Sequence, residues 1–286
     1  MSTRLRADLA LVFIAFIWGA TFVVVKRALD DISSVLFLTA RFSLAAVFLA
    51  IYFRHGWMPR REHLLSGLLV GACLGVGYAL QTVGLETTTP ANAGFITGFY
   101  IPLVPILSAL YFRRLPARAE AVGVVIATIG IGLLTWPEGE LSFRKGDLFV
   151  LGCAVAFAFH ILLTGHYSKF VPHGPLSFAQ IAVAALSGWA TFWWVEPVRV
   201  VWSAAVIAAL LTTALFATAL ALAVQTWAQK HTTSTRTALI FALEPVFAWI
   251  TSYFMTGEVL SLRSACGAVA VLAGILLVEL RPGKSS

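Results

Sequence analysis

Residues 203–228 read SAAVIAALLTTALFATALALAVQTWA, and this stretch contains no charged side chain. About 20 apolar residues in a helix cross the hydrocarbon layer of a bilayer, so the stretch predicts a membrane span. Nine similar runs accompany it along the chain of 286 residues. The ten predicted spans are 8–25, 34–53, 62–85, 90–112, 117–136, 147–165, 175–195, 203–228, 232–256 and 262–280.

The composition excludes a soluble protein. Hydrophobic residues make up 59% of the chain and charged residues 12%, whereas a soluble domain carries roughly 25% charged residues. The runs lack the alternation of barrel strands, so they are predicted to be helices, whose backbones are satisfied in lipid. The net charge of +7 does not indicate nucleic-acid binding, because the Lys and Arg residues are scattered at the ends of runs. No cofactor or metal is predicted.

Two questions concern the start of the chain. The run 8–25 could be a signal peptide, but it is longer than the usual signal core of about 7–15 residues and no clear cleavage site follows it. With a cytoplasmic amino terminus, thirteen Lys and Arg residues fall inside the cell and six outside, the six being Lys26, Arg27, Arg144, Lys145, Arg199 and Arg263. The positive-inside rule therefore predicts that both termini are cytoplasmic.

The chain contains an internal repeat. Gln81–Thr82 recurs later in the chain as Gln225–Thr226. Gly123 and Gly130 recur as Gly267 and Gly274, and the spacing between the two copies is the same in each case. Asp8–Leu9 is matched by Asp147–Leu148. Because five spans are an odd number, the second copy must enter the membrane from the opposite side, as in many secondary transporters. We expect halves at 1–140 and 141–286, inverted around a central cavity, although apolar helices can also resemble each other by chance.

Prolines and glycines indicate how these helices bend and pack. Pro102, Pro105 and Pro245 fall in corresponding spans of the two halves, where each removes a backbone donor and predicts a kink. Kinks there would point to the binding site, although they can also serve packing alone. Two sets of glycines at four-residue spacing predict close helix approach: Gly67, Gly71 and Gly75, and Gly94 with Gly98.

Several segments resemble the EamA-type members of the drug/metabolite transporter superfamily. These are Trp18–Phe22, Arg41–Phe42, Ala238–Phe247 (ALIFALEPVF) and Gly257–Glu258. The resemblance covers essentially the whole chain and is greatest to bacterial exporters of aromatic amino acids. It implies a ten-helix fold, a central cavity, alternating access and export of amino acids or similar metabolites.

One position departs from related small multidrug transporters. Those proteins carry a glutamate in the first helix, eight residues before a lysine, and here Trp18 stands eight residues before Lys26. The departure argues against a proton-coupled exporter of cationic drugs of that design. Glu244 keeps an organic-cation or multidrug exporter open as the alternative.

Ionisable groups within apolar runs are costly and therefore candidates for function. Arg41, His160 and Glu244 are such groups. Glu244 can accept the ammonium group of an amino acid or carry a proton, or it can satisfy backbone groups near Pro245. Arg41 can pair structurally with a buried carbonyl or with Glu244, and His160 can be a hydrogen-bonded packing residue.

Aromatic and amide side chains complete the predicted substrate site. Tyr78 and Gln81 share one face of their helix, and Gln225 is the repeat counterpart of Gln81. Aromatic walls with a few polar partners suit a zwitterion with a large apolar side chain, although a single aromatic residue in a span is more often core or lipid-facing. The candidate binding residues are Trp18, Tyr78, Gln81, Asn92, Phe99, Tyr100, Phe157, His160, Gln225 and Glu244.

The sequence therefore predicts a secondary transporter of the bacterial inner membrane. A membrane enzyme would need clustered His, Asp or Cys residues, and a channel would need rings of charge or a carbonyl filter. No P-loop motif occurs, so ATP hydrolysis by that route is excluded. The expected partners are a small-molecule substrate and the lipid bilayer. The oligomeric state is left open, and a monomer is compatible with the sequence.

Overall fold

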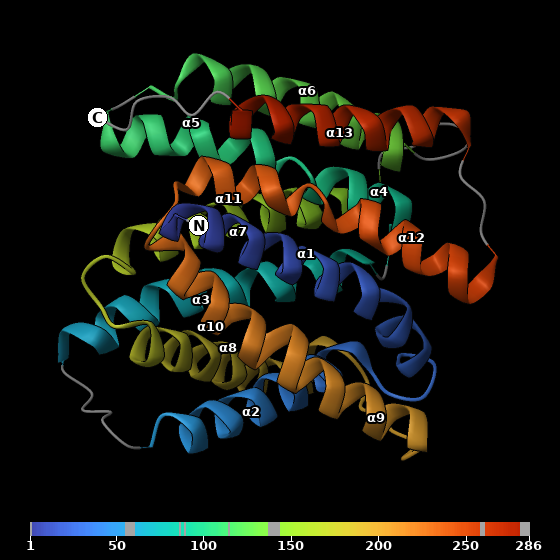
Figure 1. Ribbon diagram of the computed structural model, residues 1–286. Coiled ribbons are helices and arrows are strands. Elements are labelled where there is room, and N and C mark those ends of the chain that lie inside the picture. Colours follow the sequence, from blue (N-terminus) through green and yellow to red (C-terminus); the bar gives the residue numbers. More distant parts are fainter. Residues whose placement is uncertain are drawn as a thin grey trace.

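The computed structural model describes residues 2–54, 61–85, 87–88, 90–113, 115–136, 144–257 and 261–280, and these form a bundle of long helices (Figure 1). The helices of the first half are α1 (Thr3–Ala28), α2 (Ser34–Tyr52), α3 (Arg61–Leu85), α4 (Pro90–Thr97), α5 (Tyr100–Phe112) and α6 (Arg118–Thr135). Those of the second are α7 (Lys145–Tyr167), α8 (His173–Val195), α9 (Ala204–Thr212), η1 (Thr213–Leu220), α10 (Ala221–Gln229), α11 (Ser234–Phe241), α12 (Glu244–Thr256) and α13 (Leu262–Leu280).

Ten spans are long and apolar enough to cross a membrane within the described residues, and they confirm the ten predicted runs. Seven spans are single helices. The other three are composite: α4 with α5, α9 with η1 and α10, and α11 with α12. Large apolar side chains on the outside of the bundle, such as Leu110, Leu186 and Phe254, are 72%, 68% and 81% exposed. In a membrane these side chains contact lipid instead of water, so their exposure is not unfavourable as it would be in a soluble protein.

Two of the composite spans are broken, and the breaks differ from the kinks predicted from proline. One break falls at Gly98–Phe99, and the other at Ala242–Leu243. Pro102 and Pro245 lie in the first turns of α5 and α12, where the missing N–H has no helical acceptor to lose. These prolines therefore begin a new helix instead of bending a continuous one. Pro105 alone lies inside a helix.

The third composite span contains a π-helix that the sequence did not predict. Thr213–Leu220 forms η1 between α9 and α10 without interrupting the span. A π-helix is rare and is frequently found at functional sites. The carbonyl group of Ala217 in this segment is described with the site below.

Small residues allow the closest helix contacts. A Cβ atom on Gly123 would lie 2.7 Å from the carbonyl oxygen of Gly274, and one on Gly130 would lie 2.8 Å from that of Gly267. The four glycines of the sequence repeat therefore face each other where α6 packs on α13. Gly67, Gly71 and Gly75 pack in the same way against α8, as predicted. The prediction was wrong for Gly94, whose Cβ position has nothing within 4 Å.

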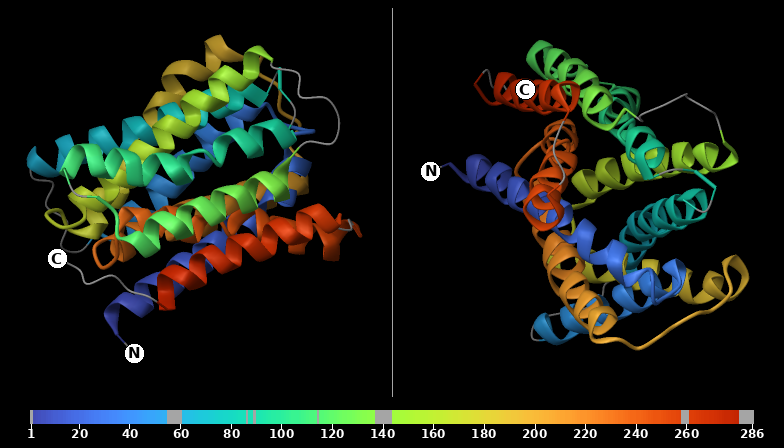
Figure 2. Two further views of the ribbon diagram at one scale, coloured as in Figure 1. Left: turned by 90° about the horizontal axis from the view of Figure 1, so that it is seen from above. Right: turned by 90° about the vertical axis from the view of Figure 1, so that its right-hand side faces the viewer.

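The start of α1 and the end of α13 lie on the same face of the bundle. Asp8, near the start of α1, pairs with Arg236 at the start of α11 at 2.9 Å, and Arg236 also pairs with Glu279 at the end of α13. Figure 2 shows the start of α1 (blue) and the end of α13 (dark red) on this side of the bundle, which we call the terminal end. An even number of spans requires this arrangement.

Helix contacts repeat across the two predicted halves. Helix α1 packs against α12, and α7 packs against α5; α3 packs against α7, and α10 packs against α1. These pairs are the ones that two related five-span halves would produce. The boundary at residue 140 lies outside the described residues, and the division into halves stays a prediction.

Candidate substrate-binding site

A buried arginine is fixed at the middle of the bundle by the π-helix. Arg41, about midway along α2, donates from Nε to the hydroxyl of Thr218 at 2.6 Å and from Nη2 to the carbonyl of Ala217 at 3.1 Å. The hydroxyl of Thr218 donates in turn to the carbonyl of Thr213. These bonds satisfy part of a charged group that is only 7% exposed, and they hold the guanidinium in one orientation.

Trp18 joins the same carbonyl from another helix. Its indole nitrogen donates to the carbonyl of Ala217 at 2.8 Å, and its ring meets that of Phe241 edge to face at 4.9 Å. The neighbouring Gly19 lies against the first turn of α12, because a Cβ there would be 2.7 Å from the carbonyl oxygen of Glu244. Trp18 and Glu244 are therefore brought to the same level by the tight contact of α1 with α12.

Tyr78 stands beside the arginine with aromatic rings on two sides. The ring of Tyr78 contacts those of Phe42 and Phe157 at 5.2 and 5.3 Å, and the Arg41 Cζ lies 6.0 Å from its centroid. Phe157 in turn lies against Gly77, which leaves no room for a Cβ there. The guanidinium of Arg41 thus lies beside the Tyr78 ring, which packs edge to face against two phenylalanine rings.

Glu244 provides a negative charge at the same depth. It is the first residue of α12, where the amide groups of a helix start favour an anion. The carboxylate lies within electrostatic range of Arg41, Tyr78 and Tyr100. Among the described residues, none forms an ion pair with it at 4.0 Å or less or donates a hydrogen bond to it. As a whole, the residue is half-buried.

Gln81 extends the polar surface along α3. Its amide nitrogen lies 3.5 Å from the hydroxyl of Thr97, at the end of α4. Thr97 also interacts with the thiol of Cys153 on α7. The break after Thr97 therefore leaves a hydroxyl between two helices.

We call six residues the central cluster: Trp18, Arg41, Tyr78, Tyr100, Phe157 and Glu244. They come from α1, α2, α3, α5, α7 and α12, and each lies near the middle of its span. Five of them are among the residues predicted to bind substrate, and Arg41 was singled out as a buried charge. The sequence missed Thr218 and Thr97, whose only signal was a hydroxyl within an apolar run.

Two other predicted residues belong to a separate network. His160, 4% exposed, contacts the amide oxygen of Gln180 at 2.8 Å, and Gln180 donates to Thr226 at 3.1 Å. Gln225 donates to Gln229 at 3.1 Å. No described hydrogen bond links Gln225 to Gln81, its counterpart in the sequence repeat. This network ties α7, α8 and α10 together, as packing requires.

The remaining candidates cannot be assigned to the central cluster. Phe99 lies at the break between α4 and α5 and is 40% exposed, and its ring meets that of Phe95 edge to face at 5.5 Å. The side chain of Asn92 and the residue Glu258 lie outside the described residues.

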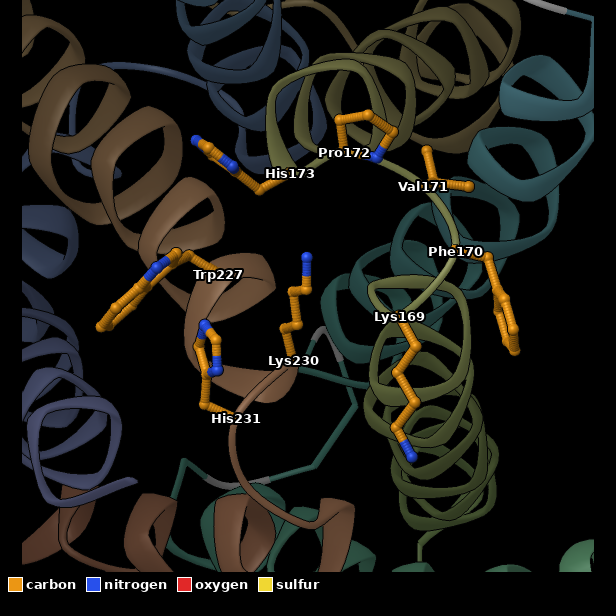
Figure 3. Close-up of a pocket in the computed structure, with 8 residues that line it drawn as sticks. All are labelled: Lys169, Phe170, Val171, Pro172, His173, Trp227, Lys230 and His231. Atoms are coloured by element: carbon orange, nitrogen blue, oxygen red, sulfur yellow. The ribbon is translucent and has the colours of Figure 1, made fainter. Parts of the chain in front are cut away.

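Two pockets of the described structure lie at opposite ends of the bundle. One of about 410 Å³ at the terminal end is formed by the α7–α8 loop and the end of α10. Figure 3 shows Lys230 extending into this space beside Trp227, while the ring of Phe170 points away. Lys169, His173 and His231 also line it, so this mouth is basic. A second pocket, at the opposite end, includes Glu196, whose carboxylate accepts from the amides that begin α2.

The donor set does not indicate a metal centre. Across the part of the chain that the structure describes, no three His, Cys, Asp or Glu side chains are grouped to hold a metal ion. The polar groups of the central cluster are a guanidinium, a carboxylate and phenol hydroxyls beside aromatic rings. Such groups bind charged and aromatic parts of an organic molecule.

Similar proteins are described as transporters. An uncharacterized transporter of Archaeoglobus fulgidus is 38% identical over 279 residues, covering 97% of this chain and 87% of the relative. YoaV of Bacillus subtilis, also an uncharacterized transporter, is 20% identical over 95% of this chain and 96% of its own. YedA of Escherichia coli K12, named an uncharacterized inner membrane transporter, is 26% identical over 52% of this chain and 50% of its own.

A solved crystal structure has the same fold. It superimposes with a TM-score of 0.81 at 18% identity, covering 96% of both chains. The family comparison matches the chain twice, over residues 5–136 and 144–280, and its description is the EamA-like transporter family. Proteins of this family are transporters and not enzymes. With ten apolar spans and two matches that together cover nearly its whole length, the chain is a multi-pass membrane protein that belongs to the EamA-like transporter family.

Proposed function

We propose that this transporter exports neutral or aromatic amino acids, or similar small zwitterionic metabolites. The observation that carries the proposal is the central cluster, in which a buried cation, a half-buried carboxylate and aromatic rings meet near the middle of the membrane. An amino acid presents the complementary groups, and aromatic surroundings suit a large apolar side chain. Arg41 would otherwise be an expensive group to keep in the membrane.

Transport in this proposal occurs by alternating access. The two halves rock about a site between them and open it to one side of the membrane at a time. The double family match and the related helix contacts support this mechanism. The interrupted spans α4–α5 and α11–α12 place helix breaks at the level of the cluster.

The proposed location is a bacterial inner membrane with both termini in the cytoplasm. The excess of Lys and Arg at the terminal end supports this orientation, and the basic pocket lies at that end. A monomer contains the whole central cluster, so transport needs no second copy in this proposal.

Uptake of radiolabelled amino acids into liposomes by the purified protein tests the proposal. Unlabelled aromatic, aliphatic and charged amino acids serve as competitors, and the assay is run with and without a pH gradient. Saturable uptake that neutral or aromatic amino acids inhibit is the expected result. Response to the gradient identifies proton coupling, and indifference to it identifies a facilitator.

A second candidate is an organic-cation or multidrug exporter. The observation that favours it is Glu244, a carboxylate beside aromatic residues without a direct ion-pair partner among the described residues. Uptake of an organic cation such as tetraphenylphosphonium, together with no uptake of any amino acid, would select this candidate.

Tyr78 and Gln81 provide the first test of where the substrate binds. We expect Tyr78→Ala and Gln81→Ala to lower uptake at least several-fold, because each removes a polar group from the site while leaving the helix intact. Size-exclusion chromatography checks that the variants stay folded. As a control, Trp194→Ala changes an aromatic residue that is 87% exposed and should transport normally. Full uptake by both site variants would show that the substrate binds elsewhere.

A further inference from the structure

Arg41 and Glu244 are opposite charges that the fold holds close but apart. Each lies within electrostatic range of the other, yet no ion pair of 4.0 Å or less joins them in the described structure. Two flexible side chains in a low dielectric would normally close into a direct pair, because the attraction rises steeply as the distance falls. Something must therefore restrain at least one of them.

The restraint acts on Arg41. Thr218 and Ala217 accept from two different nitrogens of the guanidinium, and Tyr78 interacts with it from another helix. The π-helix makes this possible by offering the Ala217 carbonyl both to Arg41 and to Trp18. A guanidinium has five N–H donors, so these bonds orient the group without using its full capacity.

The restraint on Glu244 comes from the backbone. The residue starts α12 directly after the break at Ala242–Leu243, and Gly19 packs against its carbonyl group. Its carboxylate has no described hydrogen-bond donor, although it is half-buried in the membrane-spanning region. A carboxylate in such a place needs a cationic partner.

We propose that Arg41 binds the carboxylate of the substrate and Glu244 binds its ammonium group. The inference rests on the proposed amino-acid transport and assigns the specificity of that site. A bound zwitterion completes both ion pairs at once, and Tyr78, Tyr100, Phe157 and Trp18 surround its side chain. The protein thereby selects molecules that carry both a carboxylate and an ammonium group.

Three related probes test the roles of the ammonium group and the carboxylate one at a time. L-phenylalanine carries both groups, 2-phenylethylamine carries only the ammonium, and 3-phenylpropionate carries only the carboxylate. Their affinities for the purified protein are measured by isothermal titration calorimetry. The wild-type protein is expected to bind L-phenylalanine more tightly than either of the others.

The variants Arg41→Gln and Glu244→Gln are each expected to weaken the binding of a different singly charged probe. Arg41→Gln should weaken L-phenylalanine and 3-phenylpropionate about ten-fold or more, as expected for a lost charged hydrogen bond, and leave 2-phenylethylamine within about two-fold by the same measure. Glu244→Gln should weaken L-phenylalanine and 2-phenylethylamine and spare 3-phenylpropionate. Arg41→Lys keeps the charge without the planar fork and should give an intermediate loss. The exposed Arg27→Gln is the matched control and should change none of them.

The outcomes distinguish this inference from the function on which it rests. If the wild-type protein binds L-phenylalanine but Arg41→Gln weakens all three probes equally, Arg41 is a structural anchor of the π-helix and the inference is wrong. Unchanged L-phenylalanine binding in Glu244→Gln would also overturn it. If the wild-type protein binds 2-phenylethylamine but not L-phenylalanine, the amino-acid function itself fails. Should Arg41→Gln not fold, Arg41→Lys and Glu244→Gln still decide.

Discussion

At the scale of residues, an ion-pair network closes the terminal end of the bundle. Arg236 is 2% exposed, and its guanidinium pairs with Asp8 at 2.9 Å and with Glu279. Thr232 donates to Asp8 at 2.9 Å as well. Burying charges is costly, and removing one member of a buried pair leaves the other without compensation.

Substitutions in this network should lower the stability of the protein by different amounts. We expect Arg236→Gln to lower stability by about 3 kcal/mol or more, because it leaves two carboxylates unpaired. Asp8→Asn should cost less, since Glu279 still faces the arginine. The double variant Asp8→Asn/Arg236→Gln should lose less stability than the sum of the losses in the two single variants. Thermal unfolding in detergent measures these effects.

The exposed Asp30→Asn, which removes the same charge from a loop, provides the control and should have little effect. Additive losses in the double variant would mean that Asp8 and Arg236 do not stabilise each other.

Candidate residues could be selected from the sequence where the chemistry of a single side chain is unusual for its surroundings. A lone charge in an apolar run is expensive, so Arg41, His160 and Glu244 stood out. The structure brings Arg41 and Glu244 together and places His160 in a separate network with Gln180. The partners were not predictable, because Thr218 and Gln180 lie far from Arg41 and His160 along the chain.

At the scale of elements, the ten spans were predictable because a bilayer demands a minimum apolar length. The internal form of three spans was not. Proline suggested kinks at Pro102 and Pro245, but the chain breaks earlier and uses each proline to begin a helix. The π-helix had no sequence signal, since its wider turns depend on donors from α1 and α2 that only the folded structure supplies.

The contact between α6 and α13 gives a prediction about two glycines on one helix. A Cβ at Gly130 would lie 2.7 Å from the backbone nitrogen of Val271, whereas one at Gly132 would meet only Phe95 at 3.7 Å. Backbone atoms cannot move aside as a flexible side chain can. We therefore expect Gly130→Ala to lower the melting temperature and Gly132→Ala to leave it unchanged or slightly raised, because alanine favours the helix.

Thermal unfolding of the two variants in detergent provides the measurement. The pair is well matched because the same methyl group is added two residues apart. Equal melting temperatures would show that α6 and α13 do not need their close approach.

At the scale of the whole molecule, the predicted halves touch at both ends. Thr88 donates to Asp147 at one end, and Thr233 lies 3.3 Å from the Glu120 carboxylate at the terminal end. Each contact joins a residue of the first predicted half to one of the second. If the halves rock, one of the two ends must separate in each state of the cycle.

Disulfides at these contacts test that motion. We expect Thr88→Cys with Asp147→Cys, and Thr233→Cys with Glu120→Cys, each to stop uptake after oxidation, because either cross-link keeps one end closed. Reduction should restore uptake in both. The pairs are introduced after Cys73 and Cys266 are replaced by alanine, and the buried Cys153 is kept. The single cysteine variants, oxidised in the same way, control for the substitutions themselves. If both cross-linked proteins transport at the rate of their reduced forms, the halves do not separate at these points, and substrate must cross without the rocking motion that the repeat predicts.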